Sequence, residues 1–168
     1  ASANYYYVNK SSLPKVYGGF NTSLSWKGFD LSAIFAYSIG GYIYNRDITM
    51  ILHNGSLEGR DWSTEILKRW TPENRYTDVP VLSTTSNNWN SASTRFLQNN
   101  SYMRLKNLTL SYDLPKQWIS KLALSSVQVF VQGDNLFTIH RNQGLDPEQG
   151  ITGITYYRYP AMRTISGG

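Results

Sequence analysis

The chain contains no cysteine in its 168 residues. Disulfide bonds and thiolate metal sites are therefore excluded, and the redox compartment stays open. The sequence also has no apolar run near the ~20 residues of a membrane-spanning helix. A membrane protein built of strands is still possible, because a barrel strand needs only about 9–11 residues. Residues 1–4 lack the basic and apolar segments of a signal peptide, which indicates either a protein that is not exported or an internal piece of a longer one.

Charged residues are scarce, at 16% of the sequence, against roughly 25% in soluble domains. The formal net charge is +5, but the Lys and Arg residues are scattered, so we expect no nucleic-acid binding. No phosphate loop, nucleophile elbow or pair of histidines at metal-ligand spacing is present. His53 and His140 are predicted to be solvated loop residues. We therefore expect no metal, no cofactor and no enzymatic activity.

One pair of carboxylates, Asp146 and Glu148, has a spacing that a glycoside hydrolase could use. Their neighbours in the sequence are turn formers, so a structural turn is the favoured interpretation. A glycoside-active enzyme remains the weakest of three hypotheses for the chain.

Aromatic residues are abundant, at 14% of the sequence, with 13 tyrosines and 5 tryptophans. Their amphipathic rings suit membrane–water boundaries, sugar platforms and protein contacts. The loop residues Trp62, Trp70, Tyr76 and Trp89 are the candidates for contact with a substrate or a partner. For Trp62 and Trp70 the alternative is that they pin a short helix to a sheet.

Alternating apolar and polar residues predict several antiparallel strands. One hairpin covers residues 16–26 and 29–37, with a tight turn at Lys27-Gly28. A second covers 101–137, and 156–166 is again extended. Each strand has one mostly apolar and one mostly polar face. A soluble β-sandwich could bury the apolar face, whereas a transmembrane barrel would turn it toward lipid.

The connections favour the barrel. Those at 27–28 and 113–125 are short or moderate, whereas those at 45–100 and 138–155 are long. In the first long connection, residues 62–70 resemble a short helix with Ser63 as N-cap. Alternation of short and long connections places all long loops at one end of the sheet, as in outer-membrane barrels.

Several motifs then resemble the C-terminal part of SusC/RagA-like TonB-dependent transporters, in the family's order. They are WTPEN at 70–74, YMRLKNLTLSYDLP at 102–115, NLFT at 135–138, GLDPE at 144–148 and YPAMRT at 159–164. The family pattern continues about five residues beyond the position of Gly168, with a terminal aromatic.

The resemblance implies a plugged outer-membrane barrel of about 22 strands in Bacteroidetes-type bacteria. Such proteins import oligosaccharides or peptides, with a SusD-like surface lipoprotein as lid. TonB supplies energy through an N-terminal box and plug, which are not in this sequence. We therefore predict an all-β chain of antiparallel up-and-down strands, the C-terminal segment of a transmembrane β-barrel over residues 1–168. It would have about five strands, long loops and a short helix. The alternative is a soluble β-sandwich carbohydrate-binding module.

Overall fold

The structure, a computed structural model, describes residues 8–53, 55, 59–83, 85, 91–120, 124–143, 146–148, 152–155 and 159–168. The chain divides into two compact units. We call residues 13–41, 99–149 and 159–168 the sheet unit, and residues 1–12, 42–98 and 150–158 the loop unit. Each unit is described by itself.

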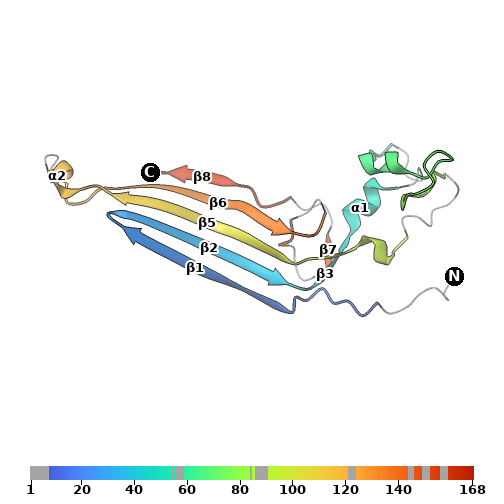
Figure 1. The fold of residues 1–168 in the computed structure, drawn as a ribbon, viewed down its shortest axis with the longest axis horizontal. Helices are drawn as coiled ribbons and strands as arrows, with labels where there is room; N and C mark the ends of the chain where they lie inside the picture. The colour runs from blue at the N-terminus through green and yellow to red at the C-terminus, as the bar shows by residue number, and fades with distance from the viewer. Residues whose placement is uncertain are drawn as a thin grey trace. The chain divides into compact units, whose positions relative to one another are not determined.

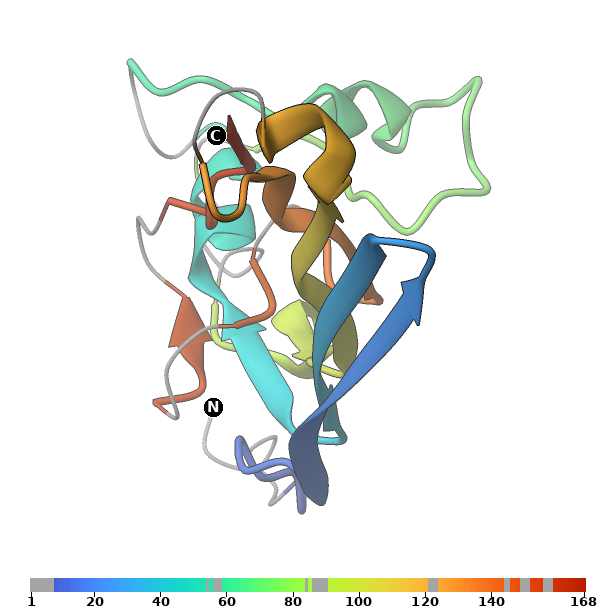
Figure 2. The same cartoon turned by 90° about the vertical axis from the view of Figure 1, so that its left-hand side faces the viewer.

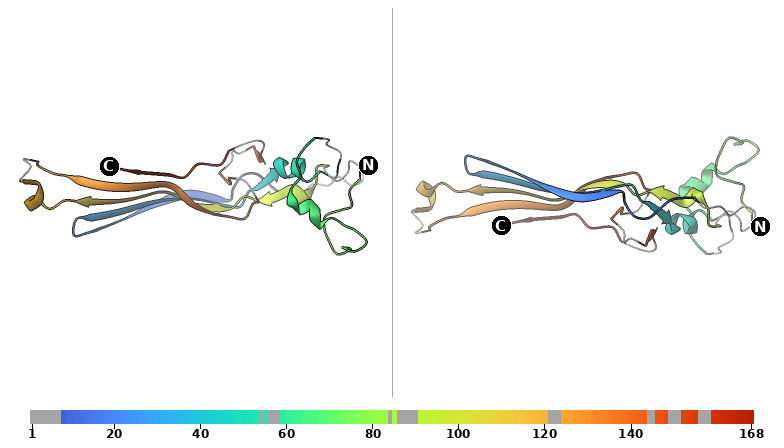
Figure 3. Two further views of the ribbon diagram at one scale, coloured as in Figure 1. Left: turned by 90° about the horizontal axis from the view of Figure 1, so that it is seen from above. Right: turned by 90° about the horizontal axis from the view of Figure 1, so that it is seen from below.

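The sheet unit is built on five antiparallel strands in the order β1-β2-β5-β6-β8. Their bounds are β1 Val16–Trp26, β2 Phe29–Ile39, β5 Tyr102–Asp113, β6 Gln128–His140 and β8 Thr164–Gly167. The four longer strands have 11 to 13 residues, enough to cross a bilayer with tilt. They lie side by side in Figure 1, and Figure 3 shows them as one twisted layer.

Two connections lie at one end of this sheet (Figures 1 and 2). Lys27 and Gly28 join β1 to β2 with φ values of 48° and 85°, the positive angles of a type I′ hairpin turn. Between β5 and β6, Pro115 caps the helical turn α2, Lys116–Ile119. The fixed φ of proline suits a helix start. Both features were predicted from the sequence.

The register gives the sheet one apolar and one polar face, because directly paired residues point to the same side. Leu24 pairs with Leu31, Leu31 with Leu110, and Leu110 with Val131. On the other side lie Ser23, Ser32, Thr109, Gln132 and Ser166. The apolar face is open: Leu24 is 66% exposed and Val131 54%. A sandwich would cover that face with a second sheet, and the described strands of this unit all lie in one.

A β-bulge keeps the two faces consistent along β5. Ala36 of β2 pairs with Arg104, and Ala33 pairs with Leu108, so Lys106 is an extra residue. If the same sequence alternated strictly, with no bulge, Arg104 would lie on the same side as Leu108, which is the apolar face. Opposite the bulge, Asn135 of β6 has a φ of 52°, a left-handed conformation that Asn tolerates. The bulge therefore turns Arg104 to the polar face.

Aromatic rings gather on the apolar face near the hairpin turn. The ring centroids of Phe29 and Tyr112 are 4.4 Å apart, and Lys27 Nζ lies 4.9 Å from the centre of the Trp26 ring. Such aromatic residues at one end of the strands are typical of the girdle of an outer-membrane barrel.

The loop unit contains more regular structure than the predicted loop at 45–100. Its elements are β3 Tyr42–Asn45, α1 Arg46–Ile51, the 3-10 helices η2 Thr64–Lys68 and η4 Thr94–Phe96, β4 Leu97–Asn99 and β7 Ile154–Thr155. The predicted helix at 62–70 is the shorter η2, and its predicted cap is confirmed, because the Ser63 side chain accepts from the Glu65 amide.

The loop unit has its own core. Phe96 is 1% exposed, Ile43 2%, and Asn45, the N-cap of α1, is fully buried. The rings of Tyr44 and Phe96 meet edge to face at 6.2 Å. No periodic pattern in the sequence predicts these contacts, because the buried residues lie on very short elements.

The prediction of one extended strand at 156–166 was wrong in extent. Ile154 pairs with Tyr44 in the small sheet β4-β3-β7, whereas β8 covers only Thr164–Gly167. Residues 156–158 lie outside the described part. No helix in the described residues is long and apolar enough to cross a membrane.

Candidate functional site: a buried ion-pair cluster on the polar face

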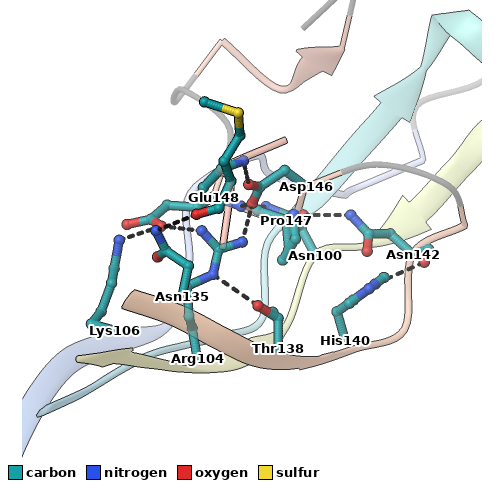
Figure 4. Close-up of polar contacts among 12 residues, drawn as sticks. Asn100, Arg104, Lys106, Asn135, Thr138, His140, Asn142, Asp146, Pro147 and Glu148 are labelled. Atoms are coloured by element: carbon teal, nitrogen blue, oxygen red, sulfur yellow. Dashed lines mark hydrogen bonds and ion pairs between the residues drawn. The ribbon is translucent and has the colours of Figure 1, made fainter. Parts of the chain in front are cut away.

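Arg104 is the centre of a polar cluster on β5 (Figure 4). The residue is 3% exposed. Its guanidinium donates from Nε to Thr138 Oγ1 at 2.9 Å, from Nη1 to Glu148 Oε2 at 2.8 Å, and from Nη2 to Asp146 Oδ1. Lys106 Nζ reaches the same Glu148 oxygen at 2.5 Å. We call Arg104, Lys106, Asp146 and Glu148 the Arg104 cluster.

Asp146 joins two chain segments to the strand. Besides Arg104, its carboxylate accepts from the backbone N–H of Glu148 at 2.9 Å and of Ala161 at 2.7 Å. Burial on its own raises the pKa of Asp146, but the Ala161 amide, the Arg104 guanidinium and the Glu148 amide together hold that pKa below its ordinary value. The carboxylate therefore stays charged and anchors the segment that leads into β8.

A chain of amide contacts extends the anchor. Asn100 Nδ2 donates to Pro147 O at 2.9 Å, and Asn142 Nδ2 donates to Asn100 Oδ1 at 3.3 Å. His140 Nδ1 lies 2.9 Å from Asn142 O. A carbonyl oxygen only accepts, so Nδ1 carries the proton and Nε2 is the free ring nitrogen of the neutral form. Both arms of the turn after β6 are thus tied to the start of β5.

A cavity of about 300 Å³ lies beside the cluster. Arg104, Thr138 and His140 line it from the strands, and Pro160, Ala161 and Arg163 from the segment before β8. Arg104 and Thr138 are register partners, as are Tyr102 and His140. All these strand residues belong to the polar face, so the cavity opens on that side of the sheet.

Both carboxylates of the predicted turn are engaged in ion pairs. Both oxygens of Asp146 accept hydrogen bonds, and Glu148 Oε2 accepts from both Arg104 and Lys106. A general acid must carry an exchangeable proton near neutral pH, and a nucleophile must be free to attack. The lowered pKa and the occupied oxygens of Asp146 suit neither role. Within the described residues no group of His, Asp and Glu side chains could hold a metal ion.

The WTPEN motif has a structural function in the loop unit. Asn74 Nδ2 donates to Lys68 O at 2.9 Å, and the Thr77 hydroxyl donates to the same oxygen at 2.6 Å. The Trp70 amide donates to Val79 O at 2.7 Å. These bonds satisfy carbonyl and amide groups that the end of η2 leaves without helical partners.

The candidate aromatic residues that the structure describes all belong to the loop unit. Trp62 is 45% exposed, Trp70 41%, and Tyr76 is fully exposed. Trp89 lies outside the described residues. Trp62 Nε1 donates to His53 Nδ1 at 2.9 Å, so Trp62 combines a packed ring with an exposed edge. The roles predicted for these residues stay predictions.

The prediction of two solvated loop histidines was wrong for His53 and imprecise for His140. His53 is 1% exposed, because Trp62 and the Gly55 amide both donate to its Nδ1 and fold the chain over it. His140 is exposed but is the last residue of β6.

The sequence interpretation did not single out Arg104. One signal could have identified it: strict alternation from Leu108 puts Arg104 and Lys106 on the apolar face, where an unpaired charge is costly. An apparent charge on the lipid side of a strand indicates either a partner or a bulge, and here both are present.

Comparison with known proteins places these features. No protein-family profile matches the chain. Two TonB-dependent receptors of Formosa agariphila match in sequence: P3 at 33% identity over 161 residues, which is 89% of this chain, and P26 at 30% identity over 168 residues, which is 94% of it. The solved RagAB peptide importer in its closed-closed state superimposes with a TM-score of 0.80 at 33% identity over 95% of the chain. A further structure of the RagAB peptide transporter gives 0.81 at 32% identity, again over 95%.

The chain is a segment of a SusC/RagA-like TonB-dependent receptor. It spans 15% and 17% of the two Formosa receptors, and 17% and 18% of the matched RagAB chains. The open sheet of the SusC/RagA-like segment is a piece of barrel wall in the bacterial outer membrane. Its apolar face is the lipid side and its polar face, with the Arg104 cluster, is the lumen side.

Proposed function

We propose that the whole protein imports a nutrient, an oligosaccharide or a peptide, across the outer membrane with energy from TonB. This segment contributes part of the barrel wall and of the extracellular rim. The observation that carries the proposal is the sheet register, which supports a lipid side and a lumen side on the same strands. The similarity to receptors and importers, with no enzyme among the relatives named above, agrees with a role in transport.

The ends of the sheet support an orientation. If the strands run as in the family, the Lys27-Gly28 turn and α2 face the periplasm. The Arg104 cluster, which lies toward the other ends of β5 and β6, then faces the cell exterior. An imported nutrient would pass this polar surface early in its path.

The exposed aromatic residues of the loop unit would contact a lid. Trp62, Trp70 and Tyr76 present large rings at low entropic cost, as protein interfaces favour. Their exposure supports contact with a SusD-like surface lipoprotein or with the nutrient itself. Trp89 belongs to the same predicted set.

Growth of the source bacterium tests the transport proposal. A strain that lacks the whole gene should lose growth on one class of nutrient, peptides or a defined glycan, as sole source of carbon. Complementation with the intact gene should restore growth, and a copy without the TonB box should not. Normal growth of the deletion strain on every peptide and glycan tested would contradict the proposal.

Pull-down of the whole receptor tests the lid contact. Tyr76→Ser removes a fully exposed ring that makes no described contact, so folding should be unaffected. We expect weaker capture of a SusD-like lipoprotein, with Tyr159→Ser, at 98% exposure in the sheet unit, as the matched control. Equal capture by both variants would exclude Tyr76 from the contact.

A further inference from the structure

The cavity on the polar face has an unbalanced set of polar groups. Within the Arg104 cluster the charges of two cations and two carboxylates cancel. Asp146 lines the cavity, yet both of its oxygens already accept hydrogen bonds, from Arg104 and from the amides of Glu148 and Ala161. Its negative charge is therefore compensated and repels an incoming anion only weakly.

Arg163 supplies a cation that no described carboxylate compensates. The residue lines the cavity and is exposed, and among the described residues no carboxylate lies within ion-pair distance of it. A guanidinium presents a planar fork of donors that matches a carboxylate in two hydrogen bonds. The described lining of the cavity thus carries one net positive charge.

A hydroxyl on the strand side complements that charge. Thr138 Oγ1 accepts from Arg104 Nε at 2.9 Å, which leaves its hydroxyl proton to donate. Thr138 and Arg163 both line the cavity. A hydroxyl donor on β6 and a cation on the segment before β8 therefore border the same space.

The size and position of the cavity limit what it could hold. A volume of about 300 Å³ is at the small end of ligand sites, enough for a carboxylate group with the residue or sugar that bears it. The polar face is the lumen side, along which a nutrient passes. An anionic group on the nutrient is the ligand that fits both constraints.

We propose that this cavity is a carboxylate-binding subsite of the import path, with Arg163 as the charged anchor and Thr138 as its hydrogen-bonding partner. The proposal rests on the proposed function, since it makes the acid group of a passing nutrient the ligand. The carboxylate could come from a peptide C-terminus or from a uronic acid, and both present the same planar anion.

Binding of small probes to the whole receptor in detergent tests the subsite. N-acetylglycylglycine should bind more tightly than its C-terminal amide in ligand-observed NMR titrations. Arg163→Gln should weaken binding of the acid by about tenfold or more, since a charge-assisted hydrogen bond is lost, and leave the amide unchanged. Arg163→Lys should recover part of the affinity. Lys116→Gln, on α2 at the other end of the sheet, is the matched control and should bind as the wild type.

Glucuronate with glucose as its neutral partner forms the second arm. Binding of glucuronate as well as the peptide acid supports a subsite for any carboxylate, whereas binding of only one acid identifies its source. Equal binding of acid and amide, or unchanged binding by Arg163→Gln, would overturn the subsite. If the deletion strain loses growth but the receptor shows no preference for the acid, the import proposal holds and the subsite fails. If the receptor binds the acid but the deletion strain grows normally, the subsite holds and the import proposal fails.

Discussion

The sheet unit and the loop unit place their apolar side chains in opposite ways. The sheet unit exposes Leu24, Val131 and Ile165 at 54–76%, whereas the loop unit buries Phe96 and Ile43 almost completely. The strands are therefore held by their hydrogen-bonded ladder and by the lipid that covers one face. The loop unit depends on its own small core, as a water-soluble domain does. The predictions below test this difference.

The largest effect is expected from Arg104→Met. Removal of the guanidinium leaves Asp146 charged, 8% exposed, and without its main partner, which typically costs about 3–5 kcal/mol. Unfolding of the whole receptor in urea should reveal the loss, and proteolysis should cut near residues 141–148 and 159–163. Adding Asp146→Asn should restore part of the stability, because it removes the buried charge. No rescue would show that Arg104 acts through packing.

A cavity created by substitution in the core of the loop unit should lower the free energy of unfolding by nearly as much. Phe96→Ala removes a ring that is 1% exposed, and such changes cost about 3–5 kcal/mol. Leu24→Ala on the exposed apolar face is the matched control and should cost less than about 1 kcal/mol in detergent. Protease sensitivity of the loop unit measures the first change. Equal effects of the two changes would refute the contrast between an internal core and a lipid-covered face.

Loss of one hydrogen bond in the loop unit should have an intermediate effect. Trp62→Phe keeps most of the ring but removes the donor to His53 Nδ1, which should cost about 1–2 kcal/mol. Trp70→Phe, whose described hydrogen bond comes from the backbone, should cost less. Thermal unfolding separates them. If Trp62→Phe keeps full stability but no longer captures the lipoprotein in a pull-down, Trp62 serves binding alone.

Acid should weaken the Arg104 cluster before the loop core. Burial on its own raises the pKa of Asp146. Hydrogen bonds from Ala161, Arg104 and Glu148 outweigh that effect, so the pKa is lowered in the folded protein. A lowered pKa adds stability. This stability is complete at a pH above the pKa of the unfolded state, and it is lost as the pH falls through the pKa of the folded state. Proteolysis by pepsin at residues 159–163 should therefore increase below about pH 4. Asp146→Asn should remove this pH dependence and give high cleavage throughout.

The smallest effect concerns the bulge. Asn135→Gly should be nearly neutral because glycine adopts the observed φ of 52° freely. Asn135→Val should cost about 1–2 kcal/mol, since a β-branched residue is strained there. Thermal unfolding gives both values. A neutral valine variant would mean that β6 can change its register at this point.

Much of the sheet could be predicted because the strands face lipid on one side and the polar lumen on the other. Apolar and polar residues therefore alternate with a period of two. The β1–β2 hairpin, its Lys27-Gly28 turn and α2 follow from local chemistry that needs no distant contact. The motifs were found by resemblance, but their reasons, such as the cap made by Asn74 and the anchor made by Asp146, needed coordinates.

The rest depends on contacts between residues far apart in the chain. Arg104 meets Asp146, which lies 42 positions further along the chain, and no periodicity encodes that pairing. His53 is buried because Trp62 folds over it, a contact within an irregular segment. The predicted aromatic residues and the Arg104 cluster also belong to different units, so a search for loop aromatics could not find the cluster.

The bulge at Lys106 has a consequence for barrel assembly. A one-residue slip of β5 exchanges the faces of all its side chains. Here a slip would expel Leu108 and Leu110 from the lipid side and drive Arg104 into it. The side chains of β5 therefore define its register. Only one alignment of β5 between its neighbours places Leu108 and Leu110 toward lipid and Arg104 next to Asp146.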